Sequence, residues 1–136
     1  MTSKTNEWII SHAAELLELQ FIMSQPKAAD AETLCADLAT LAGWLARSAV
    51  LVAEAEALYD FELGYETSAV MLSQNGAATS QVGKIAAGNC SDIKRVYLTA
   101  ERLNAALVHA IDATRTLISY EKTLYYNQDG KNTGGK

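Results

Sequence analysis

Residues 31–73 read AETLCADLATLAGWLARSAVLVAEAEALYDFELGYETSAVMLS, a stretch without proline and with two glycines. Its first apolar residues are spaced by four, three and four positions: Leu34, Leu38, Leu41 and Leu45. The seam continues at helical spacing through Leu51, Ala55, Leu58, Tyr65, Ala69 and Leu72. This periodicity is typical of one face of an α-helix, so we predict one long helix over 30–73. The sequence leaves open whether Gly43 or Gly64 interrupts it, because glycine costs a helix about 1 kcal/mol relative to alanine.

Two further helices are predicted on either side of the long one. The first spans 6–24, with Asn6 as its N-cap and Pro26 as its stop. The other spans 92–126 and carries a stripe of apolar residues at spacings of three and four, which includes Ile93, Val96, Ala100, Leu103, Leu107, Ala110, Leu117 and Leu124.

The remaining segments are a connector and a tail. Residues 74–91 are small and polar with three glycines, which predicts a connector with room for one short helix over 79–87. Residues 128–136 contain no apolar side chain, so we expect a disordered tail. The expected fold is all-α: residues 1–127 form one domain, a long antiparallel helical hairpin with the N-terminal helix against one end. Because such a hairpin leaves apolar surface uncovered, we expect it to assemble into an oligomeric bundle.

Composition excludes several classes of protein. One proline and eight glycines among 136 residues give too few turns for a sandwich or a barrel. The longest strictly aliphatic run is 49–53, from which we expect no membrane-spanning segment. No secretory signal precedes Glu7, so we expect a cytoplasmic protein whose cysteines, Cys35 and Cys90, are free thiols.

We find no motif for catalysis or metal binding. His12 and His109 have no ligand residues at the spacing of a metal site. The Gly83-Lys84 pair lacks the other residues of a phosphate-binding loop. The carboxylates fit exposed helix faces, and neither cysteine has a histidine near it in sequence. We therefore predict that the chain is not an enzyme and needs no metal or other cofactor.

Charge is distributed unevenly along the chain. Residues 1–74 carry three basic and eleven acidic residues, whereas residues 75–136 carry eight basic and five acidic ones. The net charges are −8 and +3. The basic residues predicted to contact a nucleic-acid backbone are Lys84, Lys94, Arg95 and Arg102. Alternatively, these basic residues have a structural role, because basic residues that flank the apolar seam of a helix often pair with carboxylates across a hairpin.

Three short segments carry a family resemblance: AEAEALY at 53–59, KIA at 84–86 and RTLISYEK at 115–122. Over residues 45–127 the chain resembles small helical-hairpin proteins encoded beside recombination and replication genes in tailed phages. It is also similar in layout to UvsY-type recombination mediators. Unlike those mediators, the chain is net acidic.

The resemblance implies a non-enzymatic accessory protein of DNA recombination or replication in the host cytoplasm. Its implied partners are single-stranded DNA, a recombinase or a single-strand-binding protein, with the chain itself as a homo-oligomer. The alternative function is a phage-encoded inhibitor or sequestering protein directed at a host defence factor. In that hypothesis an acidic row imitates a line of phosphates, with Glu54, Glu56, Asp60, Glu62 and Glu66 as its members.

Overall fold

The fold is all-α, as predicted. A computed structural model describes residues 1–25 and 30–132, and within them the chain forms four helices and no strand. The helices are α1 (Ser3–Ser24), α2 (Ala31–Ser73), α3 (Thr79–Asn89) and α4 (Ser91–Asn132).

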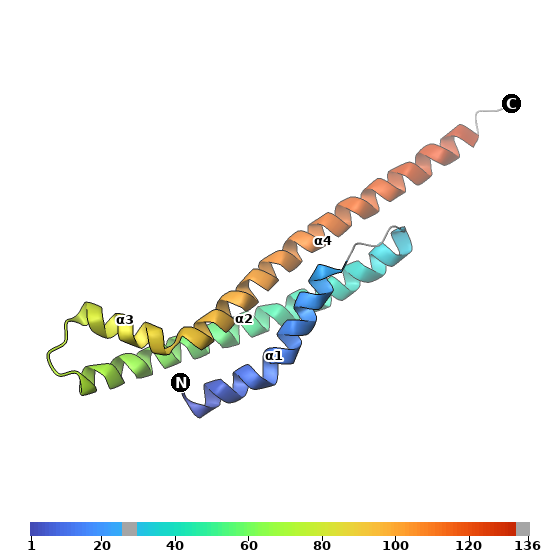
Figure 1. The fold of residues 1–136 in the computed structure, drawn as a ribbon. Helices are drawn as coiled ribbons and strands as arrows, with labels where there is room; N and C mark the ends of the chain where they lie inside the picture. The colour runs from blue at the N-terminus through green and yellow to red at the C-terminus, as the bar shows by residue number, and fades with distance from the viewer. Residues whose placement is uncertain (26–29, 133–136) are drawn as a thin grey trace.

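The two long helices α2 and α4 lie side by side and run in opposite directions (Figure 1). The short helix α3 packs on α2 near the turn of this hairpin. Helix α2 is continuous through Gly43 and Gly64, which answers the question that the sequence leaves open.

Three boundaries differ from the sequence-based expectation. Helix α1 begins at Ser3 and takes Thr2 as its N-cap, so the prediction of Asn6 is wrong. The short helix expected over 79–87 of the connector is present as α3, which ends two residues later, at Asn89. Helix α4 continues to Asn132, so the expected disorder is wrong for 128–132. Extending a helix that is already formed needs no new nucleus, so polar residues can continue it. Residues 133–136 lie outside the described part of the chain.

Helix α1 lies along the middle of the hairpin and not against one end, as its side-chain contacts show. Its Leu19 packs with Leu41 of α2 and with Leu107 and Ile111 of α4. One turn earlier, Leu16 joins a second cluster with Leu51 and Ala100. The core is therefore a line of contacts shared by three helices.

Helix α2 is apolar enough to be considered as a membrane-spanning helix. An 18-residue window of this helix has a mean hydropathy of 1.4, and 17% of that window is buried. By length and composition α2 is thus the one described helix able to cross a membrane. The length of the strictly aliphatic run 49–53 is too narrow a criterion, because glycine and serine lengthen an apolar window without adding charge. Such a window is weak evidence for a membrane helix, since core helices of soluble proteins share it.

The two glycines inside α2 make the continuity of this helix testable. A Cβ added at Gly43 would meet no atom within 4 Å. We expect Gly43→Ala to stabilise the fold by about 1 kcal/mol, because alanine loses less conformational entropy in a helix. Urea unfolding followed by circular dichroism measures the change.

Gly76 is the matched control for this substitution. It has equally open surroundings, but its φ is +90°. Gly76→Ala should therefore destabilise the fold by about 1–2 kcal/mol. A Gly43→Ala variant less stable than the parent would contradict a straight, regular α2 at this position.

Candidate nucleic-acid interface

Three of the four basic residues predicted from the sequence line one shallow groove. It lies where α3 meets α4 and has a volume of about 460 Å³. Its lining residues are Ala87, Gly88, Ser91, Lys94, Arg95, Leu98, Thr99 and Arg102. The fourth predicted residue, Lys84, is exposed on α3 but does not line the groove.

The groove exists because the chain changes direction at Cys90. This residue ends α3, and its amide donates to the carbonyl of Ala86 at 3.2 Å. Cys90 and Ile93 are both fully buried and hold the junction against the rest of the fold. At 100° per residue, Lys94, Leu98 and Arg102 lie on the side of α4 opposite the core residue Ala100. Packing the apolar stripe therefore turns the basic residues outward.

Most of the positive charge in the groove is not neutralised within the chain. Arg95 pairs with Asp92, and both side chains are exposed at 76% and 58%, so this pair is screened by solvent and weak. Neither Lys94 nor Arg102 forms an ion pair with another residue in the described part of the chain. The structural alternative, pairing with carboxylates across the hairpin, is not realised for these two residues.

Arg95 and Arg102 belong to a longer exposed row on α4. His109 follows at the same interval of seven residues and is also exposed. Seven residues of helix rise about 10 Å. Leu98 lies between the two arginines, half-buried, and gives the groove an apolar floor. Its position off the core stripe of α4 is a signal that the sequence analysis missed.

The tyrosines do not join the basic groove. Tyr97 stacks on Tyr59, with ring centroids 6.2 Å apart. Burial raises the pKa of Tyr97, and the negative charges of Glu101, Glu56 and Asp60 raise it further. This acidic, stacked environment makes Tyr97 an unsuitable platform for an anionic strand. Tyr125 and Tyr126 are exposed and lie near Ala31, by the opposite end of the hairpin.

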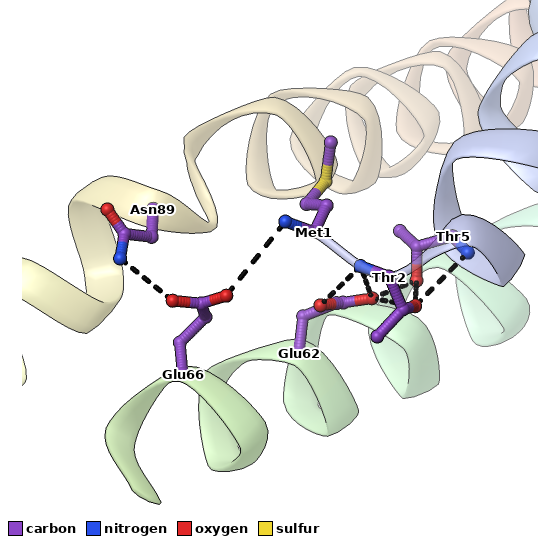
Figure 2. Close-up of polar contacts among 6 residues, drawn as sticks. All are labelled: Met1, Thr2, Thr5, Glu62, Glu66 and Asn89. Atoms are coloured by element: carbon purple, nitrogen blue, oxygen red, sulfur yellow. Dashed lines mark hydrogen bonds and ion pairs between the residues drawn. The ribbon is translucent and has the colours of Figure 1, made fainter. Parts of the chain in front are cut away.

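The acidic row proposed as a phosphate mimic is largely used inside the molecule. Glu62 is fully buried. It accepts hydrogen bonds from the Thr2 amide, at 2.9 and 3.1 Å to its two oxygens, and from the hydroxyls of Thr2 and Thr5 (Figure 2). Glu66 accepts from Asn89 Nδ2 at 2.8 Å and lies 3.9 Å from the amine of Met1.

A third member of the row, Glu54, is also engaged, because its Oε2 accepts from the indole of Trp8 at 2.9 Å. Three of the five carboxylates therefore attach α1 and α3 to α2. Glu62 and Glu66 are shielded from solvent whereas Glu54 stays exposed, so the five carboxylates do not form a continuous row that faces solvent.

These contacts set the ionisation of two buried groups. Burial by itself would raise the pKa of Glu62, but the hydrogen bonds from Thr2 and Thr5 outweigh it and the pKa is lowered. Burial raises the pKa of the Cys90 thiol, and the neighbouring Glu66 and Glu62 add to the effect. A thiol held in its neutral form is a poor nucleophile. Cys35 is exposed and free.

A larger groove of about 520 Å³ lies between α1 and α2, where Trp8 stacks on His12 at 4.5 Å. Its charged residues, Lys4 and Glu54, are of opposite sign, and Glu54 is held by Trp8. The groove between α1 and α2 is therefore a less favourable site for an anionic strand than the α3–α4 groove. No group of three or more potential metal ligands occurs among the described residues.

Comparison with known proteins returned no similar sequence or structure: no family model matches the chain, and neither the curated proteins nor the solved structures contain a significant match.

The buried carboxylate makes a prediction about stability. We expect Glu62→Gln to destabilise the fold by about 1–3 kcal/mol near neutral pH. The glutamine amide replaces one of the two acceptor oxygens by an NH2 group, which is a donor and would face the donors of Thr2 and Thr5. Chemical denaturation measures the loss. Glu18→Gln, at an exposed position of α1, is the control and should change stability little.

The same pair of proteins should respond differently to acid. Since the pKa of Glu62 is lowered from its ordinary 4.5, its contribution is complete above that value and is lost as the pH falls through the lowered pKa. The stability difference between parent and Glu62→Gln should therefore shrink below about pH 4.5. A difference that stays constant down to pH 2 would contradict the buried, ionised carboxylate.

Proposed function

We propose that this chain is a non-enzymatic accessory protein of phage-type DNA recombination or replication that binds single-stranded DNA. The observation that carries the proposal is the α3–α4 groove, in which Lys94, Arg95 and Arg102 converge. Proteins that bind single strands without sequence preference combine a positively charged groove that follows the backbone with aromatic side chains on which the bases stack. This groove supplies the positive charge and, in place of an aromatic ring, the apolar side chain of Leu98.

The distribution of charge supports an oriented approach of the strand. The acidic residues Glu56, Asp60 and Glu101 lie close enough to Tyr97 to raise its pKa, and none of the three lines the groove. A net charge of −5 therefore does not prevent binding, because the local field at the groove is positive. Repulsion by these three carboxylates disfavours contact at Tyr97 and so favours contact through the groove.

The groove is small, which limits the expected affinity. Arg95 and Arg102 span about 10 Å along α4, enough for a few nucleotides of one strand. We therefore expect weak binding by a single chain that depends strongly on salt. A recombinase or a single-strand-binding protein as an additional partner follows from the resemblance to phage mediators. The cytoplasmic location expected from the sequence is also part of the proposal.

The alternative function, inhibition of a host defence factor through an acidic phosphate mimic, is not favoured. Glu54, Glu62 and Glu66 are engaged within the chain. The remaining two members, Glu56 and Asp60, are too few to imitate a phosphate row.

Fluorescence anisotropy with a labelled oligonucleotide tests DNA binding by the groove. The test variant is Lys94→Glu/Arg102→Glu, which reverses two exposed charges. We expect its affinity at low salt to fall more than about tenfold. The slope of log K against log salt should become shallower by about 1.4, because each single-strand phosphate contact contributes about 0.7.

Arg115→Glu/Lys122→Glu is the matched control, since it makes the same change of net charge on the same helix. Both residues are away from the groove, so the variant should keep most of the affinity and the slope. Equal losses in the two variants would mean that binding follows net charge and does not use the groove. Absence of binding by the parent below high micromolar concentration at low salt would remove DNA from the proposal.

A further inference from the structure

Helix α1 has two apolar faces, and the fold covers one of them. Leu16 and Leu19 are buried against α2 and α4. The opposite face carries Ile10, Leu17 and Phe21, which are 77%, 64% and 64% exposed. Ala14 lies between them and is exposed as well. The spacing Ile10, Ala14, Leu17, Phe21 is four, three, four, the pattern of a coiled-coil seam.

We propose that this face is a self-association surface, on which α1 pairs in antiparallel orientation with α1 of a second copy of the chain. In the proposed register Ile10 of each copy lies against Phe21 of the other, and Ala14 lies against Leu17. The inference goes beyond the proposed function and does not depend on DNA binding.

The order of side-chain sizes selects a second copy in this orientation. Antiparallel pairing places the small Ala14 opposite the large Leu17 twice, so each leucine fills the space that an alanine leaves. Parallel pairing would oppose Phe21 to Phe21 and Ala14 to Ala14, which crowds one end and leaves a gap in the middle. The seam is thus complementary to itself when reversed.

The antiparallel register brings no two carboxylates at the edge of the seam into direct contact. Glu7 and Glu18 lie along one edge of the exposed face. Reversal of the partner helix brings Glu7 level with Ser24 and Glu18 level with Ala13, so neither carboxylate meets another directly. Both stay at the rim, where they remain solvated.

The exposed area is that of a weak dimer. Ile10, Leu17 and Phe21 together expose roughly 400 Å² of apolar surface, the size of the larger patches on monomers that act in binding. Pairing two copies would bury at most about 800 Å² of this surface, less than the roughly 1,200 Å² of standard stable interfaces, so we expect a weak dimer. The basic groove contains no residue of α1, so self-association leaves both grooves available.

Sedimentation equilibrium of the full chain and of substituted chains tests the surface and the register together. The parent should reach a monomer–dimer equilibrium. Leu17→Ala should weaken the dimer at least about tenfold, because the contact occurs twice in each dimer. Ala14→Leu should also weaken it, since it sets leucine against leucine. The double exchange Ala14→Leu/Leu17→Ala restores one large and one small residue in each pair, so its affinity should return to within about threefold of the parent.

Leu72→Ala is the control, because Leu72 is 85% exposed on α2 and lies outside the seam. It should leave the dimer unchanged. Ala14 and Leu17 are exposed in the single chain, and circular dichroism should show that every variant keeps its helix content.

Two results would overturn self-association through α1, and a third would overturn its register. One is a parent that remains monomeric at several hundred micromolar. The other is a dimer indifferent to both single α1 substitutions, which would place self-association on another surface, such as the groove between α2 and α4 lined by Leu38, Ala42 and Val108. Single losses that the double exchange fails to restore would reject the antiparallel register.

Discussion

The packing of α1 onto the hairpin is the interaction on which the rest of this structure depends. Two helices alone can bury only the narrow strip along which they touch. Leu19 closes that strip from a third side by contacting Leu41 of α2 and Leu107 of α4. The N-terminal end of α1 is fixed by a different kind of contact, the fully buried carboxylate of Glu62 with Thr2 and Thr5. Apolar burial supplies the driving force, and the carboxylate sets the register of α1 on α2.

This arrangement explains why the two signs of charge behave differently. Glu54, Glu62 and Glu66 lie where α1 or α3 meets α2, so they are taken up in attaching one helix to another. Lys94 and Arg102 lie on the side of α4 that no other helix covers. An acidic chain can therefore present a basic groove, because its carboxylates are partly consumed by the fold. The same fold leaves the outer face of α1 apolar and open, and this face is the proposed self-association surface.

Much of the fold could be predicted because it depends on local patterns. The spacing of apolar residues from Leu34 to Leu72 predicted a long helix over 30–73, which is within one residue of the observed Ala31–Ser73. The helix boundaries that failed depend on contacts remote in sequence or on the cooperativity of helices. Thr2 replaces Asn6 as a cap because Glu62, sixty residues away, holds it. The polar end of α4 is helical because the helix before it is already formed.

Sequence by itself determined the all-α class, the hairpin of two long helices and the group of basic residues on α4, because helical periodicity and charge order are properties of neighbouring residues. Only the tertiary structure decided which charges are available. It joined Lys94, Arg95 and Arg102 in one groove and left Lys84 outside it. It also decided that Glu62 is buried and hydrogen-bonded to the N-terminal end of α1, and which apolar face of α1 is covered and which is exposed. The physical reason is that exposure and pairing depend on which helices lie against each other, and local periodicity does not encode that choice.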